Sequence, residues 1–287
     1  EPERKETLKR LADKYLLDYI GDEALSDKQF MHIYGNMIKT VDFVAESLCK
    51  EFSESKFTPK GFEFKIGLGK DSDIPAIEYS VDGKKVYLRG SIDRVDTYEQ
   101  NGVTYVRVID YKTYAKKFSA DLVAYGIDTQ LLHYLFAYCE KTGSKPAGAL
   151  YYTVTLPNVN IKGTETEETI KKQIEKQLTR NGIVLDNEDV VYAMSPDLSF
   201  VPVSYNKTEG RLKSKSLRSE EEFNELSQSL KNQVETLANN VFCGNMDINP
   251  NDFDGKADSC KYCPLGEFCR SKKTKEDDEG EADDSAE

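Results

Sequence analysis

The sequence lacks any apolar run near the roughly 20 residues that a membrane span requires, and it has no secretory signal. It also lacks an excess of positive charge, because its formal net charge is −12. A surface that coats DNA would be cationic overall, so any contact with nucleic acid must be local. Tryptophan is absent, and the two histidines, His32 and His133, fall on amphipathic helical patterns. Packing or exposure is the commoner role for a histidine in that position, with metal binding as the alternative.

What remains is the composition of a globular protein, with 38% apolar and 31% charged residues in 287 positions. That length suits one large domain or two ordinary ones. The chain opens on Glu1-Pro2-Glu3-Arg4 in the manner of a fragment, and we expect a cytoplasmic location. Six cysteines without a secretory signal indicate a reducing compartment and metal chemistry rather than disulfides. We expect the acidic tail, 271–287, to be disordered.

Residue patterns predict an α/β fold, with a mixed sheet flanked by helices. Two helices are expected before residue 53, the second from about Ser26 to Glu51 with a Ser26–Gln29 capping box. The apolar stripe predicted for that helix is Phe30, Ile33, Met37, Val41, Val44 and Leu48. Further helices are expected over 124–142, over 165–180 with Thr164 as a capping option, and from a Ser219–Glu222 capping box to about 241. Strands are expected at 62–66, 77–80, 86–97, 103–111 and 145–156.

One hairpin, Gly90 to Lys112, is the most informative segment. Asn101-Gly102 between two runs of β-forming residues predicts a two-residue type I′ turn. Residues whose numbers sum to 203 then face each other, which pairs Tyr98 with Tyr105 and Asp96 with Arg107.

The same register sets Asp93 opposite Asp110, where two carboxylates repel unless a cation or a shared proton lies between them. Lys112 points to the same face as Asp110. Oxygen ligands of this kind favour Mg²⁺ or Mn²⁺ over zinc, with Lys112 orienting or activating water, or stabilising charge on a phosphate. An Asp-x-Lys sequence alone is more typical of a solvent-exposed strand edge. The second carboxylate, Asp93, on the facing strand is what favours a metal site.

Three neighbours add to the candidate site. Glu63, on a preceding strand, is either a further carboxylate ligand or a surface residue. Gln130 and Tyr134 share one helical face because they are four residues apart. They either position a phosphate or the waters of a metal ion, or they pack the helix on the sheet.

Together these motifs resemble the RecB-type branch of the PD-(D/E)XK nuclease superfamily, and within it the nuclease domains of the AddB family. The resemblance is carried by Glu63, the Gly90-x-x-Asp93-Arg94-Val95-Asp96 run, Asp110-Tyr111-Lys112, Gln130-x-x-x-Tyr134, the Ala147–Tyr152 run, and the run from Cys260 to Cys269. It is dense from about 57 to 157 and returns from about 200 to 270.

The resemblance implies a restriction-endonuclease-like core at 57–157, preceded by packing helices at 1–56. Residues 158–270 complete the domain and include a cysteine-bearing loop. It implies Asp93, Asp110 and the Tyr111 carbonyl as metal ligands and Lys112 as the catalytic lysine. Glu63, Gln130 and Tyr134 complete the implied catalytic set. The implied activity is Mg²⁺- or Mn²⁺-dependent hydrolysis of single-stranded DNA beside a helicase subunit, AddA, in double-strand break repair and recombination.

Three cysteines, Cys260, Cys263 and Cys269, are suited to zinc or an iron–sulfur cluster, and either needs a fourth ligand. The resemblance implies a 4Fe–4S cluster whose fourth cysteine, like an upstream histidine of the metal site, precedes the nuclease core. Neither appears at a matching position, so we expect the cluster to be incomplete or absent in this chain and present in the full-length protein. Cys49 and Cys243 are expected to be buried structural thiols.

Two other functions stay open from the sequence. One is a catalytically silent scaffold of the same fold that binds DNA or a partner subunit. The other is a zinc-binding interaction domain, which depends only on the three cysteines and leaves the hairpin unexplained.

Overall fold

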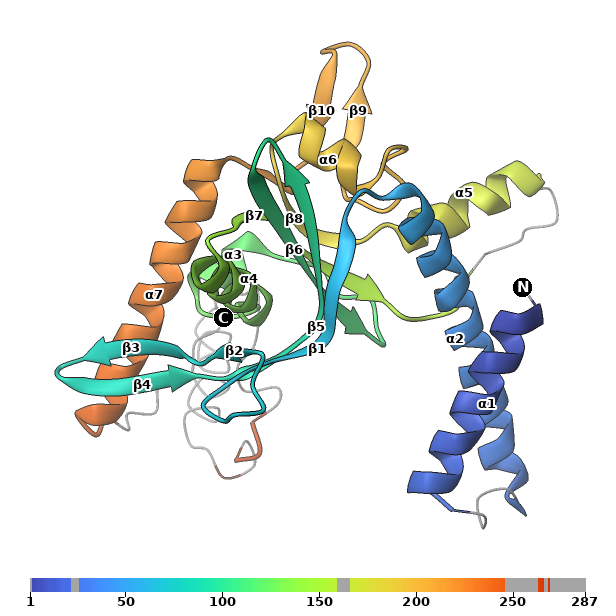
Figure 1. Cartoon of the computed structure of the whole chain (residues 1–287), viewed down its shortest axis with the longest axis horizontal. Coiled ribbons are helices and arrows are strands. Elements are labelled where there is room, and N and C mark those ends of the chain that lie inside the picture. The colour runs from blue at the N-terminus through green and yellow to red at the C-terminus, as the bar shows by residue number, and fades with distance from the viewer. Residues whose placement is uncertain (1, 22–25, 159–165, 246–262, 266–267, 269–287) are drawn as a thin grey trace, which may run out of the picture. The chain divides into compact units, whose positions relative to one another are not determined.

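The protein was analysed as a computed structural model, which describes residues 2–21, 26–158, 166–245, 263–265 and 268. Its elements lie in the order shown in Figure 1. The helices are α1 (Pro2–Tyr19), α2 (Lys28–Glu54), α3 (Ala120–Ala124), α4 (Gln130–Thr142), α5 (Glu167–Leu178), α6 (Glu188–Met194) and α7 (Glu220–Phe242). The strands are β1 (Thr58–Gly67), β2 (Ile74–Pro75), β3 (Ile77–Val81), β4 (Lys84–Leu88), β5 (Gly90–Gln100), β6 (Val103–Lys112), β7 (Lys145–Thr153), β8 (Asn181–Leu185), β9 (Ser204–Asn206), β10 (Arg211–Lys213) and β11 (Leu217–Arg218).

The predicted mixed sheet is confirmed. It has seven strands in the order β11-β8-β7-β6-β5-β1-β2. Strands β5 and β6 pair antiparallel, β6 and β7 parallel, and β7 and β8 antiparallel. The central strands are apolar on both faces, as expected for strands covered by helices. Helix α4 packs on β6 and β7, and α2 ends on the opposite side of the sheet (Figure 1).

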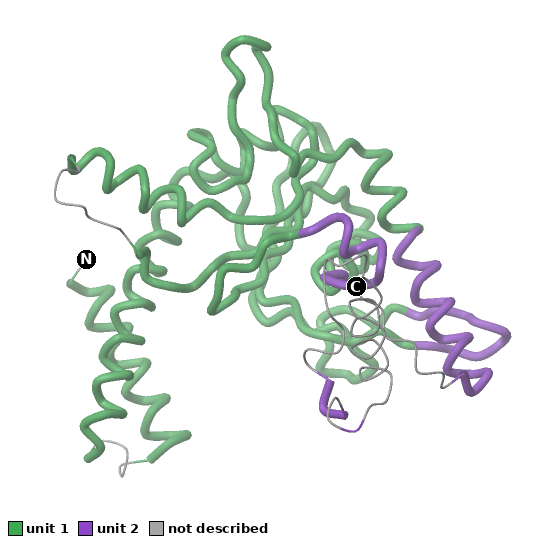
Figure 2. Tube along the Cα trace, turned by 180° about the vertical axis from the view of Figure 1, so that it is seen from behind, with its two compact units in different colours: residues 1–77, 87–118, 130–228 green, residues 78–86, 119–129, 229–287 purple. Residues whose placement is uncertain are grey.

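Two compact units interleave along the chain (Figure 2). The first comprises residues 1–77, 87–118 and 130–228 and contains the whole seven-stranded sheet. The second comprises 78–86, 119–129 and 229–287. Inside the second unit, the Gln233 side chain donates a hydrogen bond to the carbonyl of Val123 (2.9 Å). No helix of the described residues is long and apolar enough to cross a membrane.

The ends of several helices follow their sequence signals. The capping box at α7 is confirmed, because Ser219 N–H donates to Glu222 Oε2 and Glu222 N–H donates to Ser219 Oγ. The predicted box at Ser26 is wrong. Asp27 caps α2 instead, with its carboxylate accepting from the N–H groups of Gln29 and Phe30.

Two other expectations for helices need correction. Thr166 caps α5, and the other option, Thr164, lies outside the described residues. The helix predicted over 124–142 begins only at Gln130, as α4, and Ala124 is the last residue of a separate helix, α3. Gly126 and Asp128 separate them with φ values of 79° and 58°, which a right-handed helix cannot accommodate.

The apolar stripe predicted for α2 is only partly buried. Val44 is buried, whereas Ile33, Met37 and Val41 are exposed. The buried positions of the helix are Tyr34, Val44, Ser47 and Glu51. One charged residue at the end of α2, Glu51, is thus among the most buried side chains of the molecule.

Candidate active site

The hairpin of β5 and β6 has the predicted turn and register. Asn101 and Gly102 have φ values of 53° and 77°, as a type I′ turn requires. Ladder pairs run from Gln100–Val103 to Arg94–Ile109, so partner numbers sum to 203 throughout. The predicted pairs are confirmed, with the Tyr98 and Tyr105 rings 6.5 Å apart and Arg107 Nε 2.8 Å from Asp96 Oδ2.

The ladder stops one step before Asp93, and β5 and β6 fork there. Asp93 Oδ2 accepts a hydrogen bond from the backbone N–H of Tyr111 (2.8 Å), a donor that the strand ladder leaves unpaired. The N–H and C=O of one strand residue point toward the same neighbouring strand. The Tyr111 carbonyl therefore also faces the β5 side of the fork, where Asp93 lies.

Asp110 follows Ile109, the last residue of β6 that pairs with β5, and it is 7% exposed. Its Oδ2 atom is 2.6 Å from Lys112 Nζ, but the two groups are not oriented as a hydrogen bond, so Oδ2 is a buried acceptor without a directed donor. Burial raises the pKa of the Asp110 carboxyl; Lys112 opposes the rise and Asp93 adds to it. Burial alone would lower the pKa of Lys112, but Asp110 outweighs it and the pKa of the ammonium is raised.

Glu63 lies level with Asp93 on the neighbouring strand. The pairs Phe62–Arg94 and Phe64–Ile92 flank the two residues. Glu63 is exposed and has φ 51°, a left-handed conformation that is uncommon for any residue but glycine. Among the residues that the structure describes, no three His, Cys, Asp or Glu side chains gather closely enough to hold a metal ion. Glu63 therefore does not join Asp93 and Asp110 in a three-carboxylate cluster.

Gln130 and Tyr134 contact each other as their spacing predicts. Gln130 Nε2 donates to Tyr134 Oη (2.9 Å), and Tyr134 is buried against the first residue of β5. A Cβ atom placed on Gly90 would lie 2.2 Å from Tyr134 Oη and 2.6 Å from Cε1. The glycine that begins the Gly90-x-x-Asp93 run is thus required for α4 to approach the strand that carries Asp93.

We expect Gly90→Ala to displace Tyr134 and to lower the free energy of unfolding by about 1–3 kcal/mol, as overpacking does. Truncation of the ring in Gly90→Ala/Tyr134→Ala should restore part of that loss. Denaturant unfolding measures both variants. Gly35→Ala is the control, because nothing lies within 4 Å of its Cβ position in α2 and alanine favours a helix. If Gly90→Ala were as stable as wild type, the proposed contact would be wrong.

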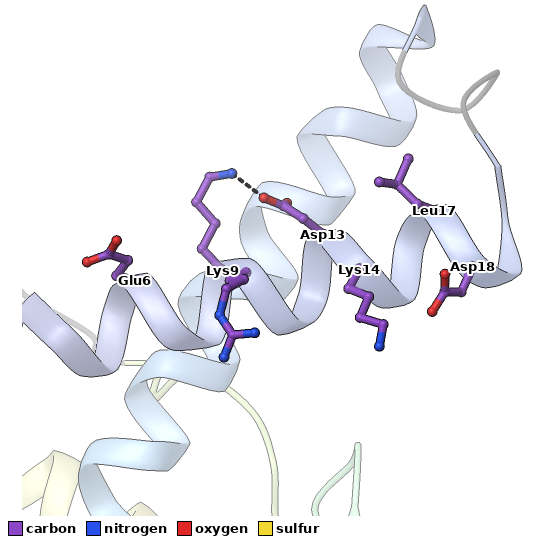
Figure 3. Close-up of a pocket in the computed structure, with 7 residues that line it drawn as sticks. Glu6, Lys9, Asp13, Lys14, Leu17 and Asp18 are labelled. Atoms are coloured by element: carbon purple, nitrogen blue, oxygen red, sulfur yellow. Dashed lines mark hydrogen bonds and ion pairs between the residues drawn. The ribbon is translucent and has the colours of Figure 1, made fainter.

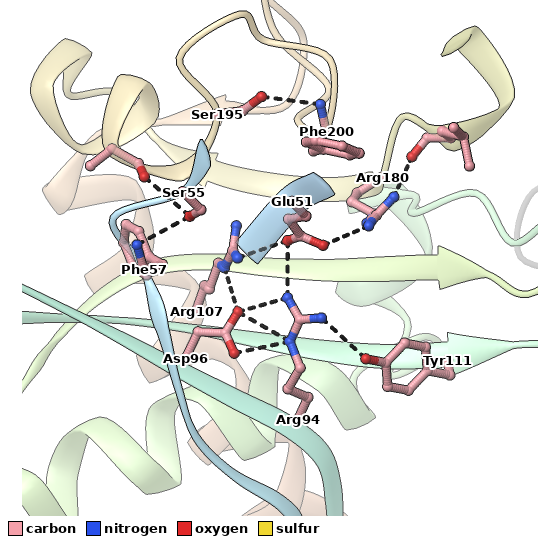
Figure 4. A network of polar contacts seen from close by, with 12 residues as sticks. Glu51, Ser55, Phe57, Arg94, Asp96, Arg107, Tyr111, Arg180, Ser195 and Phe200 are labelled. Atoms are coloured by element: carbon pink, nitrogen blue, oxygen red, sulfur yellow. Dashed lines mark hydrogen bonds and ion pairs between the residues drawn. The ribbon is translucent and has the colours of Figure 1, made fainter. Parts of the chain in front are cut away.

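A buried ionic network covers the other side of the fork, and sequence reasoning missed most of it (Figure 4). Glu51 Oε1 accepts from Arg94 (2.9 Å) and Arg107 (2.7 Å), and Glu51 Oε2 accepts from Arg180 (2.7 Å). Asp96 pairs with Arg94 and Arg107, so three guanidinium groups share two carboxylates. All five side chains are at most 1% exposed.

This network contacts the candidate site through Tyr111. Arg94 donates to the hydroxyl of Tyr111 (3.1 Å), whose backbone N–H donates to Asp93. Burial alone would raise the pKa of Glu51, but Arg107, Arg180 and Arg94 outweigh it and lower the pKa to about 2. Glu51 is therefore an anion at neutral pH and fixes the charge balance beneath the fork.

The donor set fits a divalent cation. Two carboxylates, one with a buried oxygen that lacks a directed donor, and one backbone carbonyl offer hard oxygen ligands. Mg²⁺ commonly binds one or two carboxylates together with substrate phosphates, so a third carboxylate is not required. Asp93, Asp110 and the Tyr111 carbonyl are the residues that would hold it.

Cys260 and Cys269 lie outside the described residues, and Cys263 is an exposed free thiol. The expectation that Cys49 and Cys243 are buried is wrong, because both are exposed. Cys49 lies on the outward side of α2, and Cys243 follows the last residue of α7.

A hollow along α1 has no counterpart among the predicted site residues (Figure 3). It is lined by Glu6, Lys9, Arg10, Asp13, Lys14, Leu17 and Asp18. All of these residues come from one helix, and Lys9 and Asp13 form an ion pair across it (2.6 Å). We assign no ligand to this surface.

The site therefore consists of two aspartates at a fork of central strands, a lysine two residues after the second, and a following helix with Gln130 and Tyr134. The sequence model of the PD-(D/E)XK nuclease superfamily matches residues 2–270, and the chain belongs to that superfamily. Nucleases of the superfamily generally use divalent metal ions.

Within this superfamily, the chain is similar to curated proteins that share one name. The chain is 30% identical to the B subunit of the ATP-dependent helicase/deoxyribonuclease of Clostridium kluyveri, over 93% of this chain and 24% of the relative. It is 34% identical to the protein of the same name from Clostridium acetobutylicum, over 81% of this chain and 20% of that protein. A third protein of that name, from Thermoanaerobacter sp., is 30% identical over 85% of this chain and 22% of its own length. The chain thus spans about a quarter of the length of the curated relatives it matches.

Proposed function

We propose that this chain is a metal-dependent deoxyribonuclease domain that hydrolyses phosphodiester bonds of single-stranded DNA. The observation that supports it most is the fork, where Asp93 accepts from the Tyr111 N–H and the buried Asp110 pairs with Lys112. Charged groups so placed on central strands cost stability, and such costs are typical of sites that are kept for chemistry.

Mg²⁺ or Mn²⁺ at Asp93, Asp110 and the Tyr111 carbonyl would polarise a phosphoryl oxygen and lower the pKa of a bound water. Lys112 is an ammonium at neutral pH, because its pKa is raised. It therefore donates to a phosphate oxygen and stabilises the charge that develops as water attacks phosphorus, and it is unsuited to remove a proton from that water. Gln130, exposed at the first turn of α4 and bonded to Tyr134, positions the phosphate or the attacking water. For Glu63, which the structure leaves outside a three-carboxylate cluster, we propose only an accessory role in the site.

The names of the relatives support a larger assembly. We propose that the whole protein is the B component of a helicase–nuclease that works with a helicase subunit, AddA, in the cytoplasm during repair and recombination of double-strand breaks. We also propose that Cys260, Cys263 and Cys269 supply three thiolates to a 4Fe–4S cluster of the full-length protein.

The test is cleavage of end-labelled single-stranded DNA by the 287-residue chain with Mg²⁺, with Mn²⁺ and with EDTA. We expect products with either metal and none with EDTA. Cleavage that continues undiminished in EDTA would contradict a metal-dependent mechanism.

The alternative is a silent scaffold that binds DNA or a partner subunit through the same fold. Binding of the same DNA without cleavage under any of the three conditions would favour it. The presence of Asp93, Asp110 and Lys112 at the fork argues for activity, because a decayed site usually loses one of them.

A further inference from the structure

The segment that follows the fork, Thr113–Phe118, connects β6 to the second unit without regular secondary structure. It is anchored at both ends within the first unit. The carbonyl of Lys112 accepts from the N–H of Val154 (2.7 Å), and the N–H of Phe118 donates to the Asn181 side chain. The segment is therefore held beside the fork by Val154, which follows β7, and by Asn181, the first residue of β8.

Lys116 of this segment lies close to Lys112 of the candidate site. Lys112 Nζ and Lys116 Nζ are 5.9 Å and 5.8 Å from the centroid of the same ring, that of Tyr151, which pairs with Asp110 across β6 and β7. Tyr114 lies between these two lysines in the chain, two residues from each. The shared ring of Tyr151 therefore places the segment that carries Tyr114 and Lys116 beside the strand residue Asp110.

Tyr114 has an exposed ring, with 58% of the residue accessible to solvent. The run Lys112-Thr-Tyr114-Ala-Lys116-Lys117 carries three positive charges and no negative one, in a chain whose net charge is −12. The composition excludes a generally cationic surface, and this run is the kind of local cationic patch that the candidate reaction requires.

An exposed aromatic ring beside lysines fits unpaired nucleotides. Bases stack on aromatic side chains when their own faces are free, whereas the bases of a duplex are already stacked on their neighbours. We propose that Tyr114 and Lys116 form a subsite for single-stranded DNA, with Tyr114 stacking on the base next to the bond that is cut and Lys116 binding that nucleotide's phosphate. The inference rests on the proposed function and deepens it, because it assigns the preference for single strands to two residues.

The chain contains a matched control. Tyr205-Asn206-Lys207 repeats the same spacing of tyrosine and lysine, and Tyr205 is 48% exposed on β9 of the separate two-stranded hairpin. Tyr114→Ala and Tyr205→Ala thus each remove an exposed ring, and Lys116→Met and Lys207→Met each remove one positive charge. Thermal unfolding of all four variants verifies that each is folded.

The experiment measures fluorescence anisotropy of a labelled oligothymidylate of about 12 nucleotides, within the usual range of single-strand sites, bound to the full chain in EDTA. We expect Tyr114→Ala to weaken binding about tenfold or more, Tyr114→Phe to retain it, and Tyr205→Ala to leave it unchanged. Lys116→Met should reduce the slope of log K against log salt by about 0.7, and Lys207→Met should not. A duplex of the same length should show little effect of Tyr114→Ala.

Equal binding by Tyr114→Ala and wild type, equal losses for the two tyrosine variants, or no measurable binding by wild type would each overturn the subsite. Cleavage of single-stranded DNA by wild type is measured separately. If wild type cleaves but binding is independent of Tyr114, the subsite fails and the nuclease stands. If binding depends on Tyr114 but no metal supports cleavage, the nuclease fails and the subsite stands.

Discussion

Asp110→Asn is expected to lose cleavage of single-stranded DNA by about a thousandfold while unfolding at a temperature no lower than that of wild type. A metal ligand supplies several kcal/mol of transition-state stabilisation, and each 1.36 kcal/mol is a factor of ten in rate. Burial raises the pKa of Asp110, so the ionised carboxylate is less stable in the folded chain than in the unfolded one. Neutral asparagine removes that cost at pH 7.

The measurement pairs an initial-rate assay in Mg²⁺ with thermal unfolding in EDTA, where no cation offsets the charge of the carboxylate. Asp73→Asn is the control, because Asp73 Oδ2 accepts from the N–H of Lys65 in the connection around β2 rather than at the fork. It should cleave normally. Cleavage by Asp110→Asn at the wild-type rate would refute the assignment of this residue to the metal site.

Glu51→Gln is expected to lower the free energy of unfolding by about 3–5 kcal/mol, since it leaves three buried guanidinium groups with one carboxylate. A chain of this size would then unfold about 5–8 °C lower. Glu46→Gln on the same helix is the matched control. Glu46 pairs with Arg4 at 3.1 Å but has a side chain that is 66% exposed, so its loss should cost less than about 1 kcal/mol.

The pH dependence separates charge from packing at Glu51. Its pKa is about 2 in the folded chain against 4.5 as the ordinary value, so its ionisation stabilises the fold above about pH 4.5. That contribution is lost as the pH falls from about 5 to 2. Wild type should lose stability over this range more steeply than Glu51→Gln. Parallel curves for the two proteins would show that Glu51 acts through its shape alone.

The sequence was sufficient for the fork because its signals are local. Asn101-Gly102 determines the turn, the turn determines the register, and the register brings Asp93 toward Asp110 across 17 positions of one hairpin. The Ser219 capping box is local in the same way. That Lys112 points to the same face of the sheet as Asp110 follows from the alternation of side chains along a strand.

The ionic network could not be derived in that manner. Glu51 is 43 residues from Arg94 and 129 residues from Arg180, and no pattern in the sequence states which charges meet across such separations. A usable signal did exist. Arg94, Asp96 and Arg107 alternate with apolar residues on central strands, and charges buried there require partners from a covering helix.

Left-handed residues account for other differences. Gly126 and Asp128 lie in the part of the predicted helix that is not helical, before α4 begins at Gln130, and Glu63 has a positive φ in the middle of β1. Asp and Glu at such positions have no sequence signal comparable to Asn-Gly. The short helix α6 was also missed, although Asn187 caps it by accepting from the N–H of Val190.

The hydrogen bond from the Tyr111 N–H to Asp93 gives the molecule an internal spectroscopic probe. The chemical shift of that single amide proton depends on where the lone pairs of the Asp93 carboxylate are directed. A ¹⁵N-labelled sample titrated with a diamagnetic cation would therefore record occupancy of the fork at one resonance, with no substrate and no turnover. Arg94 donates to the hydroxyl of the same tyrosine, so Tyr111 connects the fork to the ionic network on the opposite face of the sheet. The resonances of the Arg94 side chain would report whether that network responds to the cation.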